Sequence, residues 1–220
     1  MEQFITIDSY DGVIFDLDGT LIDSNWVWSG VDVEFLGKRG FQVSADYVQA
    51  IAHIGFEAAA AYTIERFGLN ETVEDIVQEW HDMAIEAYNN KVKLKSGVLE
   101  YLKYLKGKGK LMSVATASDM KLVIPALKNN KIDEYFNNIT TLREVKRGKG
   151  FPDIYDKAAE KMGLDKDKCI VFEDIIQGIA GAKSGGYRAI AVYDKYSDDD
   201  KEKIMKMCDL YIHDFKEMIK

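Results

Sequence analysis

The feature that most constrains this chain is a hydrophobic stretch near its start that leads directly into two acidic residues. Val13, Ile14 and Phe15 are followed by Asp16-Leu17-Asp18-Gly19-Thr20. Uninterrupted apolar stretches of this kind are typical of strands buried on both faces of a parallel sheet. The two carboxylates should therefore lie at the carboxyl end of a buried strand, where open α/β sheets bind their ligands. Two acids this close together need a cation, a shared proton or both.

Short apolar stretches alternate with helical patterns again after about residue 97. The helical patterns include one at 98–105, one that ends near 127, one at 152–162 and one that begins at 176. Strands are predicted at 111–115, 139–141, 169–172, 189–192 and 210–212. Strands that alternate with helices of this length imply an α/β fold with a doubly wound, Rossmann-like parallel sheet.

Residues 24–95 have a different pattern, because their apolar residues show helical spacing and no strand-like alternation. Four helices are predicted there, which indicates a small helical bundle inserted into the α/β chain. The predicted organisation is therefore a discontinuous core domain, residues 1–23 and 96–220, with an inserted helical domain at 24–95.

Charge and hydropathy exclude several classes of partner. A formal net charge of −8 argues against binding to nucleic acid or to an anionic membrane surface. No stretch approaches the ~18 apolar residues of a membrane helix, and the first residues lack a signal-peptide pattern. The only cysteines, Cys169 and Cys208, form no metal-like cluster, so we expect free thiols and a cytoplasmic location.

The segment Asp16-Leu17-Asp18-Gly19-Thr20-Leu21 resembles the first motif of the haloacid dehalogenase-like hydrolases, which are mostly phosphatases that use an aspartyl-phosphate intermediate. Further motifs follow in the family's order, and the inserted helices resemble its helical type 1 cap domain. Within this resemblance Asp16 is the expected nucleophile, because a carboxylate that forms an acyl phosphate splits one difficult hydrolysis into two steps. Asp18 is the expected general acid and base, and the resemblance also assigns its backbone carbonyl to a metal ion.

Two later segments resemble the family's second and third motifs. Val114-Ala115-Thr116-Ala117-Ser118 places a hydroxyl at a strand end, and the resemblance implies that Thr116 binds a phosphoryl oxygen together with the N–H of Ala117. Lys149 precedes a predicted helix and is expected to balance the charges of the nucleophile and the phosphoryl group. Lys146 and Arg147 are nearby alternatives for this role. The family often has Pro at the place of Gly150.

Glu173 and Asp174 follow the predicted strand 169–172 and resemble the fourth motif, which completes a metal site with Asp16 and Asp18. Mg²⁺ is the expected cofactor, because it prefers oxygen ligands and bridges carboxylate to phosphate. Asp174 is the expected direct ligand, whereas Glu173 would bind directly or through water.

The inserted helices should select the substrate, which we expect to be a small phosphorylated metabolite. Residues 24–95 contain 11 acidic and 6 basic residues, so a bulky polyanion fits poorly. Trp28 and His53 are the expected contacts of the leaving group, although a tryptophan at helical spacing is more often a core residue. No sequence feature indicates an oligomer, and a monomer is expected.

The predicted function is hydrolysis of a small phosphate monoester. A sugar phosphomutase that resembles β-phosphoglucomutase is the alternative enzyme. Such mutases carry a histidine about twelve residues after the nucleophile, where this chain has Trp28, and a basic loop where it has residues 53–57. A phosphate-binding protein without catalysis is a third possibility, but such a protein has no need for Asp16, Asp18, Thr116, Lys149 and Asp174 together.

Overall fold

The computed structural model describes residues 6–51 and 55–219, and contacts between Cα atoms divide the chain into two compact units. The core unit consists of Met1–Asn25 and Val92–Lys220, and the helical unit consists of Trp26–Lys91. The assignment of these units as a core domain and a cap domain stays a prediction. Within the described residues, no helix combines the length and the apolar character that crossing a membrane requires.

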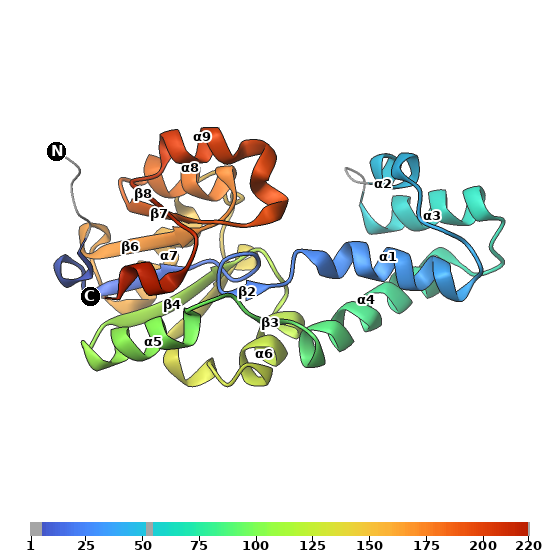
Figure 1. The fold of residues 1–220 in the computed structure, drawn as a ribbon. Helices are drawn as coiled ribbons and strands as arrows, with labels where there is room; N and C mark the ends of the chain where they lie inside the picture. The colour runs from blue at the N-terminus through green and yellow to red at the C-terminus, as the bar shows by residue number, and fades with distance from the viewer. Residues whose placement is uncertain (1–5, 52–54, 220) are drawn as a thin grey trace. The chain divides into compact units, whose positions relative to one another are not determined.

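A six-stranded sheet organises the core unit (Figure 1), and every pair of neighbouring strands in it is parallel. The strands are β1 (Gly12–Phe15), β4 (Leu111–Thr116), β5 (Asn138–Thr141), β6 (Cys169–Glu173), β7 (Arg188–Val192) and β8 (Leu210–Ile212). Their order across the sheet is β5-β4-β1-β6-β7-β8. The chain reverses its direction across the sheet at β1, so the doubly wound parallel sheet predicted from the sequence is confirmed.

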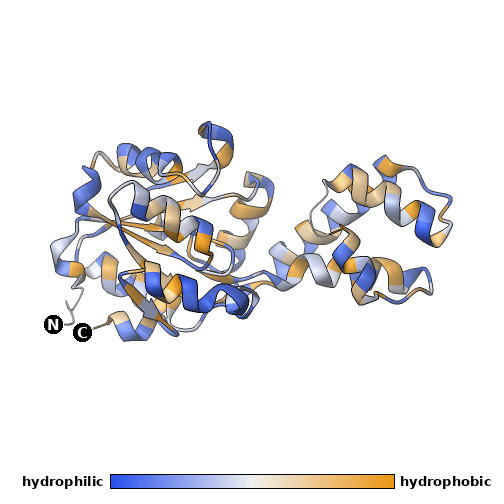
Figure 2. Cartoon of the chain, turned by 90° about the horizontal axis from the view of Figure 1, so that it is seen from above, coloured by the Kyte–Doolittle hydropathy of each residue, from blue (hydrophilic) through white to orange (hydrophobic). Residues whose placement is uncertain are grey.

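Alternation along β1 distributes its side chains between two hydrophobic layers. The helices of the core unit are α5 (Val98–Gly107), α6 (Met120–Asn129), α7 (Asp153–Met162), α8 (Ile176–Ser184) and α9 (Lys201–Met207). Ile14 packs in a cluster with residues of α7, α8 and α9. Phe15 faces the other side, where its ring lies 5.1 Å from Phe172 and 6.3 Å from Tyr101 of α5. Much of the sheet accordingly has the orange of hydrophobic residues (Figure 2).

Two short strands mark the points where the chain leaves the core unit and returns to it. β2 (Ile22–Asp23) and β3 (Lys93–Leu94) pair antiparallel, with Ile22 opposite Leu94 and Asp23 opposite Lys93. Neither strand was predicted, because a strand of two residues is too short to show alternation.

The helical unit contains α1 (Trp26–Lys38), α2 (Ala45–Ile51), α3 (Phe56–Phe67) and α4 (Val73–Asn90), as the apolar spacing predicted. The Thr72 side chain accepts a hydrogen bond from the N–H of Asp75, and Asp75 accepts one from the N–H of Thr72. This reciprocal capping explains where α4 begins. The fully buried ring of Phe35 packs edge-on against Trp80, which joins α1 to α4.

Candidate active site

Three buried carboxylates meet at the carboxyl ends of two neighbouring strands. Asp16 directly follows β1, Glu173 is the last residue of β6, and Asp174 comes next. The backbone N–H of Asp16 donates to the carbonyl of Phe172 at 2.9 Å, which fixes β1 and β6 in register. Each of the three residues is at most 2 % exposed, and one carboxylate oxygen from each lies within 4.8 Å of the others.

Lys149 supplies a buried positive charge to this group. It lies in the loop before α7, its ammonium donates to the Asp16 carboxylate, and it also donates to Oε1 of Glu173 at 2.6 Å. Burial would lower the pKa of Lys149, but the carboxylates of Asp16 and Glu173 more than offset this, so the pKa lies above its ordinary value. Lys149 is therefore charged, and the structure brings it to the acids as the sequence predicted.

The three acids outnumber the one ammonium among them. Burial, followed by the charge of Glu173, raises the pKa of Asp16 well above its ordinary value. The same two causes raise the pKa of Asp174 to about 7. A divalent cation would relieve this imbalance, and oxygen atoms at this spacing suit it, because such cations bind carboxylates. The residues present therefore fit the divalent metal that the sequence led us to expect.

Two glycines make room for the acids. A Cβ on Gly178 of α8 would lie 2.2 Å from Cδ of Glu173, and a Cβ on Gly19 would lie 2.1 Å from Oδ2 of Asp174. Gly19 also has a φ of +80°, a conformation that side chains rarely adopt. The hydroxyl of Tyr155 on α7 donates to Oε1 of Glu173 at 2.9 Å and fixes this carboxylate from a third element.

Asp18 is not one of the three acids whose oxygens meet, but its charge also contributes to the raised pKa of Asp16. Its Oδ1 accepts from the hydroxyl of Ser24 and its Oδ2 accepts from the hydroxyl of Ser118, both at 2.7 Å. Two hydroxyl donors, which lie far from each other in the sequence, thus hold the Asp18 carboxylate. The hydroxyl oxygen of Thr116 accepts from the N–H of Ser118 at 3.0 Å, and Ala117 lies between them. Ser118 therefore contacts both Asp18, which follows β1, and Thr116, which ends β4.

Comparison with known proteins agrees with this geometry. The family model described as haloacid dehalogenase-like hydrolase matches residues 13–192, which include Asp16, Asp18, Thr116, Lys149, Glu173 and Asp174. The chain belongs to the haloacid dehalogenase-like hydrolases. A phosphorylated carbohydrates phosphatase of Thermotoga maritima is 25 % identical over 180 residues, which cover 82 % of this chain and 83 % of the relative.

Solved structures share the fold. A HAD hydrolase of family IA, variant 3, from Entamoeba histolytica is 27 % identical with a TM-score of 0.75 and covers 94 % of each chain. A β-phosphoglucomutase from Clostridium difficile is 18 % identical with a TM-score of 0.68 and covers 96 % of this chain and 93 % of its own. The resemblance found in the sequence is therefore confirmed, and this hydrolase is an enzyme of the phosphatase type.

The structure adds residues to the site of this hydrolase that sequence reasoning missed. Asn25 donates to Oδ2 of Asp174 at 3.3 Å and to Oδ1 of Asp194 at 3.2 Å. Lys95 donates to Oδ2 of the same Asp194 at 2.8 Å. The Thr20 hydroxyl also donates to Asp174, at 3.3 Å. No short motif joins residues this far apart, although Asn25 and Lys95 flank the inserted helices and so occupy recognisable positions.

The two residues that the sequence assigned to the leaving group both belong to the helical unit. Trp28 is on α1 of the helical unit, where its ring lies 5.1 Å from that of Phe56 and it remains 36 % exposed. His53 lies outside the described residues. Both assignments stay predictions.

Proposed function

We propose that this hydrolase is a Mg²⁺-dependent phosphatase that cleaves a small organic phosphate monoester. The observation that carries the proposal is the position of Lys149 between Asp16 and Glu173, with Asp174 beside them. One ammonium among three buried carboxylates forms a site that attracts a metal cation together with a phosphate dianion. Asp16, Glu173 and Asp174 would hold the metal, which supplies charge that polarises the phosphoryl oxygens.

In this proposal the Asp16 carboxylate forms a bond to phosphorus while the bond from phosphorus to the alcohol oxygen breaks. Asp18 gives a proton to the departing alcohol, as a general acid. It then takes a proton from the water that attacks the aspartyl phosphate, which releases inorganic phosphate and restores Asp16. Ser24 and Ser118 orient the Asp18 carboxylate for both transfers. Lys149, Thr116 and the N–H of Ala117 would contact the phosphoryl oxygens.

The test is phosphate release from a panel of small phosphate esters, with Mg²⁺ and with EDTA. We expect release only with the metal, and none from Asp16→Asn, which keeps the shape of the side chain but removes the nucleophile. The matched control is Asp11→Asn, at the opposite end of β1 on an exposed residue, which should retain wild-type activity. Undiminished turnover by Asp16→Asn would contradict the proposal.

The same panel separates the phosphatase from the sugar phosphomutase. A mutase would convert a sugar 1-phosphate into the 6-phosphate, and inorganic phosphate would stay nearly constant. We expect the opposite, net release of phosphate, because Trp28 stands where the mutases carry a histidine. A binding protein would give neither product while retaining affinity for the esters.

A further inference from the structure

The helical unit contains a pocket of its own, with a volume of about 410 Å³. Its lining is mostly aromatic and aliphatic. Trp28 and Phe56 lie at its exposed part, with 36 % and 38 % of their surfaces accessible, whereas Trp80 is 3 % exposed. A pocket of this size and composition is typical of sites for small molecules.

Asp32 is the one ionisable side chain among the described residues that line this pocket. No described residue forms a hydrogen bond or an ion pair with its carboxylate, and burial alone raises its pKa to about 6. A partly buried carboxylate without a partner is unfavourable for folding. It therefore indicates a ligand that supplies the missing positive charge.

Among the described residues of the helical unit, no lysine or arginine is left for this purpose. Its four Lys and Arg residues all pair with other acids: Lys38 and Lys91 with Glu34, Arg39 with Glu71 and Glu79, and Arg66 with Asp46. Residues 26–91 carry 11 acidic and 4 basic residues, a net charge of −7, whereas the remainder of the chain carries −1. The field of this unit attracts cations and repels anions.

We propose that this pocket binds an organic ammonium ion, with Asp32 as its counter-ion and the rings of Trp28, Phe56 and Trp80 around its alkyl groups. Ring faces attract ammonium groups through their quadrupoles, and indole is the strongest of them. The aliphatic lining accepts the methyl or methylene groups that such an ion carries. A metal ion would gain little here, because Asp32 is the single carboxylate that the pocket offers.

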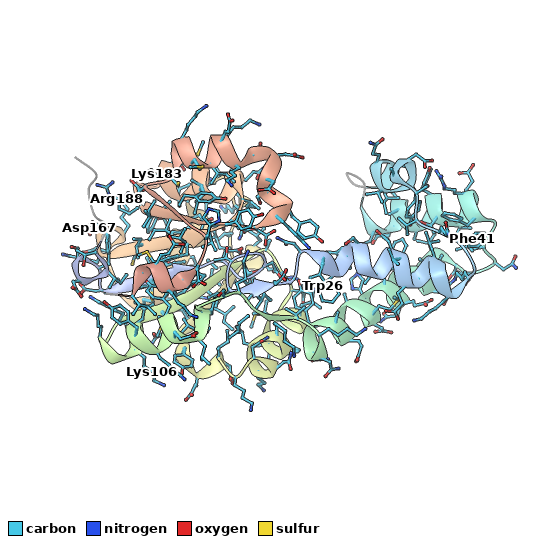
Figure 3. All side chains as sticks on the ribbon, viewed as in Figure 1. Trp26, Phe41, Lys106, Asp167, Lys183 and Arg188 are labelled. Carbon is cyan, nitrogen blue, oxygen red and sulfur yellow. The ribbon has the colours of Figure 1, made fainter. Side chains whose placement is uncertain are left out.

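The first experiment compares choline with 3,3-dimethyl-1-butanol, a neutral molecule of the same shape. The three tryptophans of the chain are Trp26, Trp28 and Trp80, so every tryptophan signal comes from the helical unit. We expect choline to shift the indole NMR signals of Trp28 and Trp80. Trp26 begins α1 (Figure 3), is not among the residues of the pocket, and serves as an internal reference. Equal binding of the neutral molecule, or no saturable shift up to about 0.1 M choline, would overturn the proposal.

The second experiment removes the negative charge of Asp32 from the pocket. Asp32→Asn should weaken choline binding about tenfold, an effect of one ion pair, and leave the affinity for the neutral alcohol unchanged. The control is Asp82→Asn, which removes the same charge from an exposed residue of α4 that does not line this pocket. An equal effect of both substitutions would assign the attraction to the net charge of the unit and refute the proposed site.

The ammonium ion has two possible sources, a separate small amine or the alcohol part of a phosphate ester. The second source rests on the proposed phosphatase function, and it predicts a higher kcat/KM for phosphocholine than for 3,3-dimethylbutyl phosphate. Asp32→Asn should abolish this preference. Similar rates for both esters together with choline binding would identify a separate amine. Because binding is measured without turnover, a failure of the phosphatase proposal is distinguishable from a failure of this one.

Discussion

Lys149 is the residue on which the charge balance of the acidic group depends. Its ammonium donates to both Asp16 and Glu173, and it is 8 % exposed. Without it, three buried carboxylates would face one another with no internal cation. The same side chain therefore contributes to folding and to the chemistry that we propose.

Replacement of this ammonium by an uncharged side chain tests both contributions. We expect Lys149→Met to lower kcat/KM by about 10²–10³-fold, the usual effect of losing one charge-stabilising group. It should also lower the free energy of unfolding by about 3 kcal/mol, because removal of one partner strands buried charges. Phosphate release and urea denaturation measure the two effects. The control is Lys146→Met, on an exposed residue of the same loop, and an equal loss in that variant would contradict the argument.

Asp32 makes the stability of the folded protein depend on pH, and its pKa sets the direction of that dependence. That pKa is about 6 in the folded protein and 3.8 in its ordinary state, so the folded protein holds the proton to a higher pH. Stability is therefore lost as the pH rises from about 4 to 6. Asp32→Asn should be about 1 kcal/mol more stable than wild type at pH 7, after allowance for solvent access. The difference should vanish near pH 4, and urea denaturation followed by tryptophan fluorescence measures it. A variant as stable as wild type at both pH values would show that the carboxylate is fully solvated.

Motif spacing predicted the acids and the lysine of the site, since each follows a strand or precedes a helix that the hydrophobic pattern also marks. It did not predict Asn25, Asp194 or Tyr155. Asn25 donates to Asp174 and Asp194, and Tyr155 donates to Glu173. These contacts depend on how the elements pack, and packing leaves no local pattern in the sequence. The polar partners of these buried acids are therefore harder to predict than the acids themselves.

At the scale of elements, α8 approaches β6 so closely that one methyl group would disturb the site. We expect Gly178→Ala to displace Glu173 and so to lower the affinity for Mg²⁺. It should also lower the free energy of unfolding by about 2 kcal/mol, because the added methyl group overpacks the site. Calorimetric titration with Mg²⁺ and thermal denaturation measure these effects. The matched control is Gly107→Ala in α5, where a Cβ would meet nothing within 4 Å. That substitution should be neutral or slightly stabilising, and a similar loss in it would refute the steric explanation.

Most strands and helices of the core unit followed from the hydrophobic pattern, but some did not. α9 spans seven residues, of which Ile204 alone is buried, so its pattern is too weak to detect. Ser118 and Asp119 are both residue types that often cap helices, and Asp119 caps α6, because its side chain accepts from the N–H of Lys121. The Ser118 hydroxyl instead donates to Asp18. Local rules failed here because the site uses the same side chain.

At the scale of the whole molecule, net charge is unevenly distributed between the two units. The helical unit carries −7 of the total of −8. Mutual repulsion of like charges lowers its stability, and salt screens that repulsion. We therefore expect 0.5 M NaCl to slow amide hydrogen exchange in α3 and α4 about threefold relative to low salt. Exchange in α5 and α7 should change less. Hydrogen-exchange mass spectrometry compares the units in one sample, and an equal response of both would contradict this expectation.

The position of β1 in the sheet has a consequence for biosynthesis. β1 is an inner strand of the sheet, yet its partners β4 and β6 come much later in the chain. At a translation rate of about 5–20 residues per second, Phe172 follows Phe15 by roughly 8 to 30 s. Before β4 is synthesised, the hydrophobic side chains of β1 have no strand to pair with, and until β6 follows they have a partner strand on one side alone. By then α1 to α4 are already synthesised and make mostly local contacts. The nascent chain should therefore expose its most hydrophobic strand longest, which makes Val13–Phe15 the natural target for a chaperone that binds near the ribosome exit.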